Sequence, residues 1–520
     1  MLGGDADSPS DSPVFASIAM LVYLLIWLLL MRPDILPLGR PGTAMVGAAL
    51  MLILREAQST VFPKTSSFDA FGTIDWDPIT LLFGLMVVNH YMEATDYIHR
   101  FEALLDHARP ARRIVNIVAM STLVSPLLMN DTVCLAFTPI VLRMCAKHRV
   151  KATLPYLMAL VTSANIGSAL TVTGNPQNSL IQSIDARLTF SRFVARQCLP
   201  TIVTQALNLL LLLAYFREDL RDDGDGGGGG GGGNGGADPL LPLAAEAAAA
   251  DTAAAAAAGA AASTHRRTKS NATTDGLGQG SAHRFFGRAF GVFFVIMVAM
   301  FVIGLDVDGV AMAMAMALLL LHALLRSCRV RRAMRRTQAG RETSIDMRGG
   351  GSLGLGLLDA KTETDVVLAK VDFGLLLLFI GQFVLVGAVV QTGVPKSFFD
   401  SMLGSGCSGA SMVAPGCVWW FGVIVIVLSN VISNVPVILM LKPLLAGVPN
   451  ADNVWLIVSF VATVAGNLCM LGSAANLIVE HQASKLGDRS MTAMAHAKFG
   501  VPSTILVAAV GIFMLTHPLW

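Results

Sequence analysis

Long apolar runs recur along this chain and limit what it can fold into. One set lies near 13–31, 42–55, 78–94, 113–145, 153–183 and 193–216, and a second lies near 285–305, 309–325, 371–392, 415–445, 454–482 and 498–516. About 20 apolar residues in a helix cross the hydrocarbon of a bilayer. Only 14% of the 520 residues are charged, whereas soluble domains are about a quarter charged. The sequence therefore predicts an all-α polytopic membrane protein.

A segment of unusual composition separates the two sets. It carries polyglycine from Gly226 onward, then polyalanine and polar residues. Such a composition buries too little apolar surface to offset the entropy lost on ordering. We therefore expect three regions: a first transmembrane repeat at 1–216, a disordered cytosolic Gly/Ala-rich linker at 217–284, and a second transmembrane repeat at 285–520.

Two apolar runs, 113–145 and 415–445, are too long for one helix and too short for two full crossings. Polar residues interrupt both: Ser125-Pro126 and Asn130-Asp131-Thr132 in the first, Ser429-Asn430 and Ser433-Asn434-Val435-Pro436 in the second. Irregular backbone at membrane depth is tolerated only where it faces protein or a water-filled cavity. Both runs are predicted to be re-entrant hairpins.

Basic residues give the predicted orientation, because they concentrate in cytosolic loops. Clusters at 100–113 and 143–151, the linker, and a basic loop at 326–365 all fall on the cytosolic side if the two hairpins do not cross. The turn with Asp306 and Asp308 is then external. The count is about ten transmembrane helices plus two re-entrant hairpins, with an odd number of crossings in each half, so the halves are inverted.

The two halves share motifs. Ser163-Ala164-Asn165 through Gly174-Asn175-Pro176-Gln177-Asn178 resembles Ala465-Gly466-Asn467 through Gly472-Ser473-Ala474-Ala475-Asn476. The polar-centred hairpins also occupy matching places. Inverted repeats with broken segments at matching positions point to a solute site near the midplane.

Polar residues and glycines of these four breaks are the candidate solute ligands. They are Asn130, Thr132, Asn165, Gly174, Asn175, Asn178, Ser433, Asn434, Asn467, Gly472, Ser473 and Asn476. Amide and hydroxyl groups can replace a hydration shell, and glycine lets backbone approach a solute. The alternative is that these small and polar residues hold helices together. Their two-fold occurrence favours the solute site.

Asp131 is the candidate site for the coupling cation. A carboxylate near the middle of a membrane is costly and is by default a functional candidate. Desolvation favours its protonated form, so the group could load and release a proton. The alternative is a wetted acid at the hairpin mouth that accepts backbone N–H bonds. Asn434 occupies the related place in the second hairpin, so the charge is asymmetric.

Other chemistry finds no support in the sequence. The polyglycine run lacks the Lys-Ser/Thr of a phosphate-binding loop, so we expect neither an enzyme nor a bound cofactor. The seven cysteines lack metal-type spacing, which argues against a metal site, although Cys407 and Cys417 could share a loop and form one bridge. A net charge of +2 indicates no nucleic-acid partner.

Three stretches make the chain resemble a known family: 130–139, 163–178 and 472–478. They are similar to the arsenite permease and Na⁺/H⁺ antiporter branch of the ion transporter superfamily, and within it to the plant silicon efflux transporters. The resemblance implies a homodimer with a scaffold domain and a moving transport domain, working by an elevator mechanism in the lipid bilayer. It also implies secondary active transport of a small inorganic solute, driven by H⁺ or Na⁺.

The resemblance leaves two functions open. One is proton-coupled efflux of a neutral metalloid hydroxide, silicic acid or arsenite. The other is a Na⁺/H⁺ antiporter, or a sodium- or proton-coupled carrier of an inorganic or carboxylate anion. Dicarboxylate carriers of the superfamily have Ser-Asn-Thr at both hairpin tips, whereas this chain has Asn130-Asp131-Thr132 and Ser433-Asn434-Val435. An acid at the tip would repel a dianion. We expect a multi-pass protein of the plasma membrane, with an organelle membrane as the alternative.

Overall fold

The computed structural model describes residues 13–32, 35–61, 68–93, 103–225, 276–341, 367–404, 406–407, 411 and 414–517. Every regular element in these ranges is a helix, and none is a strand. Six helices are long and apolar enough to cross a membrane by length and composition: Pro13–Met31, Pro110–Leu128, Phe190–Tyr215, Val307–Leu325, Phe373–Val390 and Ala493–Thr516. The expectation of an all-α polytopic membrane protein is confirmed, whereas the number of crossings and the inversion of the halves stay predictions.

Contacts divide the chain into two compact units. Unit 1 holds 1–79, 98–272 and 374–520, and unit 2 holds 80–97 and 273–373. Unit 2 thus combines segments from both sides of the predicted linker.

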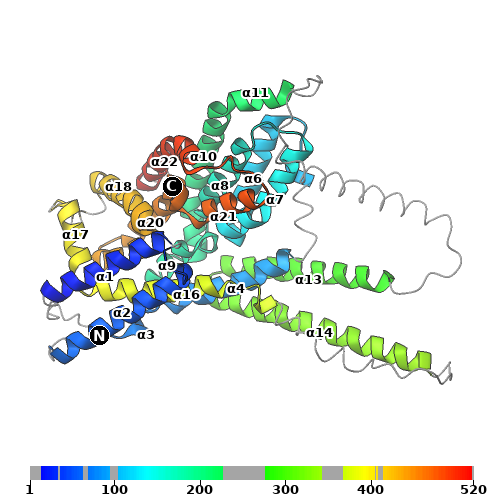
Figure 1. Ribbon diagram of the computed structural model, residues 1–520, viewed down its shortest axis with the longest axis horizontal. Helices are drawn as coiled ribbons and strands as arrows, with labels where there is room; N and C mark the ends of the chain where they lie inside the picture. Colours follow the sequence, from blue (N-terminus) through cyan, green and yellow to red (C-terminus); the bar gives the residue numbers. More distant parts are fainter. Residues whose placement is uncertain are drawn as a thin grey trace. The chain divides into compact units, whose positions relative to one another are not determined.

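Unit 2 is built from most of α4 (Trp76–Glu93) with α13 (Gly276–Val302) and α14 (Val307–Arg341). Helices α13 and α14 pack side by side, as Figure 1 shows. A Cβ atom on Gly84 would lie 2.7 Å from the carbonyl carbon of Ala311, so α4 meets α14 at backbone distance. Because α14 continues to Arg341, residues 326–341 of the predicted basic loop are helical. The rest of that loop up to 365 lies outside the described residues.

In unit 1, helices α1 (Pro13–Met31), α2 (Gly39–Val61) and α16 (Phe373–Val390) approach one another closely. A Cβ on Gly47 would lie 2.6 Å from the Ile26 side chain, and one on Gly381 would lie 2.7 Å from the Ala44 backbone. Small residues allow such close approach of apolar helices.

Each predicted hairpin consists of two helices separated by one residue. The first is α6 (Pro110–Leu128) and α7 (Asn130–Lys147), and the second is α18 (Pro415–Ile432) and α19 (Asn434–Leu445). The separating residues are Met129 and Ser433, with φ of 68° and 80°. A positive φ is uncommon outside glycine, so the same unusual geometry marks both breaks.

The breaks are narrower than the sequence predicted. Ser125-Pro126 stays inside α6 and Ser429-Asn430 stays inside α18. In place of helical partners, the carbonyl oxygen of Pro126 accepts hydrogen bonds from the Thr171 and Thr173 hydroxyls. The shared positive-φ residue also aligns Asn434 with Asn130, and Val435 with Asp131. The predicted match of Asn434 to Asp131 is therefore wrong by one residue, although the charge asymmetry holds.

A second pattern also occurs twice. Helix α8 (Leu154–Ser168) leads through a 3₁₀ turn, η1 (Val172–Gly174), into α9 (Pro176–Ile184), and α20 (Ala451–Ala465) leads through η3 (Met470–Gly472) into α21 (Ala474–Lys485). Residues 155–168 of α8 are all buried, against α6, α7 and α10 (Phe190–Tyr215). Helix α20 packs on α18 and on α22 (Ala493–Thr516). The two interrupted helices therefore form the centre of unit 1.

The predicted linker is narrower than 217–284. Helix α11 (Arg217–Asp225) follows α10 directly, and α13 begins at Gly276. Residues 226–275, with the polyglycine and polyalanine runs, lie outside the described residues, so the predicted disorder stays a prediction.

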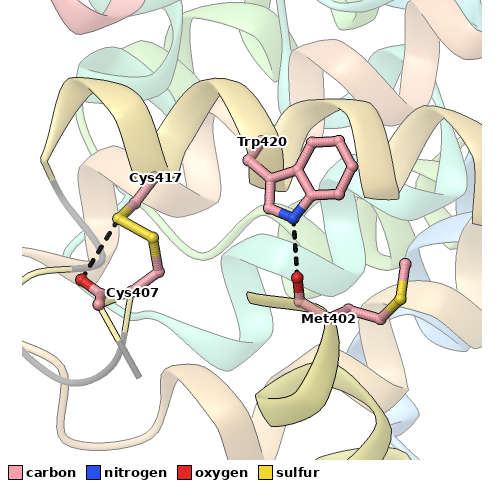
Figure 2. The surroundings of a disulfide bond; sticks show 5 residues. Met402, Cys407, Cys417 and Trp420 are labelled. Atoms are coloured by element: carbon pink, nitrogen blue, oxygen red, sulfur yellow. Dashed lines mark hydrogen bonds between the residues drawn. A yellow bond between two sulfur atoms is a disulfide. The ribbon is translucent and has the colours of Figure 1, made fainter. Parts of the chain in front are cut away.

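A disulfide joins Cys407 to Cys417 between α17 (Val394–Leu403) and α18, with Cα atoms 5.4 Å apart (Figure 2). Nearby, the Trp420 indole N–H donates to the carbonyl oxygen of Met402 at 2.8 Å. The bridge that the sequence left open is thus formed, and it ties the end of α17 to the start of the second hairpin.

Candidate functional site

A cavity of about 160 Å³ lies inside unit 1. Its walls include the tips of both hairpins, at Asn130-Asp131 and at 432–436. The start of α9 adds Pro176-Gln177, the link into α21 adds 471–474, and helices α1, α2 and α16 contribute further residues. Residues at or next to all four breaks in the backbone therefore line one cavity, which is the candidate solute site.

Asp131 lines the cavity and accepts a hydrogen bond from the backbone N–H of Ala475, in the first turn of α21. The first N–H groups of a helix lack partners within the helix and favour a nearby negative charge. Within the described ranges, the charged side chains of the lining are Asp131 and Arg40. The alternative interpretation expected these N–H bonds from the hairpin tip itself, whereas the N–H that Asp131 accepts comes from α21 in the second half of the chain.

Four residues form a directed chain of amide hydrogen bonds behind the cavity. The Asn467 Nδ2 donates to the carbonyl oxygen of Thr162 at 3.2 Å. Asn165 Nδ2 donates to Asn467 Oδ1 at 2.8 Å, and Asn130 Nδ2 donates to Asn165 Oδ1 at 2.8 Å. Because a backbone carbonyl can only accept, Thr162 fixes the direction of all three amides.

A second anchor fixes the same direction. Asn476 Nδ2 donates to the carbonyl oxygens of Gly466 and Cys469, at 2.7 and 2.9 Å, and its Oδ1 accepts from Asn165 Nδ2 at 3.2 Å. The NH₂ group of Asn165 therefore donates to two residues of the second half of the chain, Asn467 and Asn476. The Oδ1 of Asn130 is left buried without a hydrogen-bond partner among the described residues. Asn130 consequently brings an unpaired acceptor to the cavity wall.

In the first half, the amides of Asn175 and Asn178 hydrogen-bond to residues around the break between α8 and α9. Asn178 Nδ2 donates to the carbonyl oxygens of Ser168 and Thr171 at 3.1 and 2.8 Å. Asn175 Nδ2 donates to Thr463 Oγ1 at 3.0 Å, and its Oδ1 caps α9 by accepting from the Asn178 N–H. These side chains satisfy the freed backbone groups and do not line the cavity.

The predicted role of glycine needs correction at one position. A Cβ on Gly174 would lie 2.1 Å from the carbonyl oxygen of Ser168, so this glycine allows backbone to pack on backbone. Gly472 does line the cavity, although a Cβ there would lie 2.5 Å from the Oδ1 of Asn430. Gly174 therefore serves the packing of the break and does not give a solute access to backbone.

The predicted site residues fall into two groups. The cavity is lined by Asn130, Asp131, Ser433, Asn434, Gly472 and Ser473. The others, Thr132, Asn165, Gly174, Asn175, Asn178, Asn467 and Asn476, are absent from the described lining. For several of these residues the alternative interpretation fits better, because their hydrogen bonds go to other residues of the chain, either across the two halves or within the same break.

Several lining residues were missed by sequence reasoning. Tyr23 and Trp27 come from α1, Arg40 from α2, and Gln382 from α16. In the apolar sequence of α1 no signal separates these aromatic residues from lipid-facing ones. Gln177 also lines the cavity, and the motif Gly174-Asn175-Pro176-Gln177-Asn178 could have indicated it.

A charged cluster ties loops of the two halves together away from the cavity. Arg187 donates to both carboxylate oxygens of Asp185, at 2.8 and 2.7 Å, and Arg192 donates to Asp452 at 2.5 Å. The hydrogen bond from Arg187 lowers the pKa of Asp185 although burial opposes it. The cluster holds the end of α9 and the start of α10 against the start of α20.

A cavity reached by four helix breaks within apolar helices is the arrangement of a multi-pass integral membrane transporter. The sequence comparisons specify the class. Residues 23–465 match the family CitMHS, described as citrate transporter, and the chain belongs to this family of the ion transporter superfamily.

Two relatives show similarity over nearly the whole chain. The silicon efflux transporter LSI3 of Oryza sativa subsp. japonica is 32% identical over 523 residues, covering 96% of each chain. The putative transporter arsB of Dictyostelium discoideum is 30% identical over 506 residues, covering 92% of this chain and 87% of its own. The predicted resemblance is thus confirmed, and the protein is a transporter.

Proposed function

We propose that this protein is a secondary active transporter that exports a small neutral metalloid hydroxide, silicic acid or arsenite in its acid form, in exchange for protons. The observation that carries the proposal is the acceptor that Asn130 presents to the cavity. A neutral hydroxide brings O–H donors to such an acceptor. An anion brings only acceptors and would leave Asn130 Oδ1 buried and unpaired, which is costly.

The carboxyl of Asp131 supports both the solute class and the coupling. A carboxylate in the same cavity repels an anion, and a carboxyl that changes its protonation can link solute movement to proton movement. The name of one relative, a silicon efflux transporter, points to the same class of solute.

Two observations favour a second candidate, a sodium- or proton-coupled carrier of a carboxylate or inorganic anion. Arg40 lines the cavity and could neutralise an anion, and the family as a whole is described as citrate transporter. A Na⁺/H⁺ antiporter has less support, because the lining offers one carboxylate among the described residues.

For the architecture we propose two inverted repeats with about ten crossings and two re-entrant hairpins, acting as a homodimer by an elevator mechanism. The repeated element order, α6 to α10 and α18 to α22, supports the repeats. The disulfide supports the orientation, because the predicted count places the loop between α17 and α18 outside the cytosol, where disulfides form.

Flux measurements in proteoliposomes test the function. Purified full-length protein is reconstituted, a pH gradient is imposed, and silicic acid, arsenous acid, citrate and Na⁺ are followed in parallel. We expect uphill movement of a hydroxide that dissipates the pH gradient, and none in protein-free vesicles. Gradient-driven citrate flux without hydroxide flux would refute the proposal and favour the second candidate.

A further inference from the structure

Helix α1 brings an unpaired hydrogen-bond donor to the cavity. Trp27 lines it, and the indole Nε1 is buried without a hydrogen-bond partner in the part of the chain that the structure describes. An indole N–H can only donate, and a buried donor without an acceptor costs free energy. Its place in the cavity wall indicates that the acceptor is the molecule that the cavity receives.

The position of Trp27 is fixed by close helix packing. Ile26, the residue before it, lies against α2 at Gly47, where a Cβ would lie 2.6 Å from the Ile26 side chain. Tyr23, one turn earlier on the same face, is buried and lines the same cavity. This face of α1 is therefore directed at the cavity by contacts that do not involve a solute.

A second tryptophan shows how this chain satisfies an indole that has no such function. The Nε1 of Trp420 donates to the Met402 carbonyl oxygen at 2.8 Å, as Figure 2 shows. Trp420 lies beside the disulfide, and its side chain is exposed and outside the cavity lining. It serves as the matched control for Trp27.

We propose that the Trp27 Nε1–H donates a hydrogen bond to an oxygen of the transported solute, which makes α1 a part of the recognition site. The inference rests on the proposed function, because it assigns the solute a hydroxyl group. A hydroxyl both accepts and donates, so a polyhydroxide can accept from Trp27 and donate to Asn130 Oδ1 at the same time. A solute with donors alone satisfies only Asn130, and one with acceptors alone satisfies only Trp27.

Three single variants of the full chain test the inference in proteoliposomes. Trp27→Phe keeps an aromatic ring and removes the N–H, Trp27→His restores a ring N–H, and Trp420→Phe is the control. The KM and maximal rate of silicic acid and arsenous acid flux are measured, together with the thermal unfolding of each variant.

We expect Trp27→Phe to raise KM by about five- to tenfold with a maximal rate within about twofold of the wild type, as for the loss of one net hydrogen bond. Trp27→His should recover part of the loss, and Trp420→Phe should leave KM unchanged. An unchanged KM in Trp27→Phe overturns the inference. Equal increases in Trp27→Phe and Trp27→His also overturn it, since ring packing would then be the cause.

The same experiment separates this inference from the proposed function. If the wild type moves citrate and neither hydroxide, the proposed function fails, and the variants are compared with citrate. A raised citrate KM in Trp27→Phe alone would then keep Trp27 as a solute-contacting donor but remove its assignment to a hydroxyl. If Trp27→Phe has the same citrate KM as the wild type, Trp27 contacts neither a hydroxyl nor any other group of the solute.

Discussion

Two neighbouring residues at the tip of the first hairpin line the cavity with different chemical groups, an amide and a carboxyl. Asn130 is held by Asn165 and presents an acceptor, whereas Asp131 lies at the first turn of α21 and accepts the N–H of Ala475. The first is suited to a solute hydroxyl, and the second to a proton. The difference follows from their partners: Asn130 bonds to Asn165 of the same half of the chain, and Asp131 to Ala475 of the other half.

Replacing Asp131 by Asn should uncouple the proposed transport. The amide keeps the size of the side chain and removes titration, so the protein should fold. Uphill movement of hydroxide driven by a pH gradient should fall to the level of empty vesicles, while solute exchange without a gradient persists. Flux and internal pH are recorded together in proteoliposomes.

Asp131→Glu is the control, because it retains a carboxyl and should retain coupling with an altered pH profile. Uphill transport by the Asn variant with the pH dependence of the wild type would make Asp131 structural. The coupling group would then have to be sought elsewhere, first at Glu480 on α21.

Gly174 should be intolerant of a side chain for a reason unconnected with the solute. A Cβ 2.1 Å from the Ser168 carbonyl oxygen requires backbone to move, so Gly174→Ala should destabilise the protein by about 1–3 kcal/mol or more. Thermal unfolding in detergent measures the loss. Gly416→Ala, in α18 with open space around the added methyl group, should unfold like the wild type. Equal stability of the two variants would contradict the packing role.

At the scale of elements, the sequence indicated the hairpins but not where each one turns. Polar clusters at membrane depth can be recognised, because apolar surroundings make them costly. The turning residues Met129 and Ser433 adopt a positive φ although neither is glycine, so their residue types do not predict the turn. Ser125-Pro126 was predicted to interrupt its run, yet it stays inside α6, and the Thr171 and Thr173 hydroxyls donate to the carbonyl oxygen of Pro126.

The candidate site could also be predicted only in part from the sequence. Asn130, Asp131, Ser433 and Asn434 belong to breaks that the sequence marks, and they do line the cavity. Trp27 and Arg40 belong to α1 and α2, and only tertiary packing brings them there. Asn178 and Asn476 have the residue type of a ligand, but their contacts to backbone carbonyls are known only once the chain is folded.

The loop cluster around Asp185 predicts a pH dependence of stability. Its folded-state pKa is lowered, so its ion pair stabilises the protein above the pKa of the unfolded chain, about 3.9. That contribution is lost as pH falls through the lower, folded-state pKa. Asp185→Asn should therefore lower the unfolding temperature at pH 7, and the difference from the wild type should shrink below about pH 4. A difference that is constant between pH 7 and pH 3 would contradict this assignment.

At the scale of the whole molecule, the charge count and the disulfide give independent predictions of the same orientation. Epitope tags inserted within 226–275 and within 342–366 should be reachable only from the cytosol, because basic residues flank both segments. A tag beside Cys407 should be reachable only from the opposite side. Antibody binding before and after permeabilisation measures the three positions. Tags of the first two segments on different sides would break the inverted-repeat proposal.

The amide chain has a further consequence because it has a polarity. Asn130 shows an oxygen to the cavity only because Thr162, three side chains away, shows an oxygen to Asn467. The character of the binding surface is therefore set by an atom that no solute touches. A substitution at Asn467 or Asn165 could turn the Asn130 amide around and convert an acceptor surface into a donor surface. Transporters built on this scaffold could thus exchange one class of cargo for another through changes buried in the helix bundle, with every residue of the cavity wall retained.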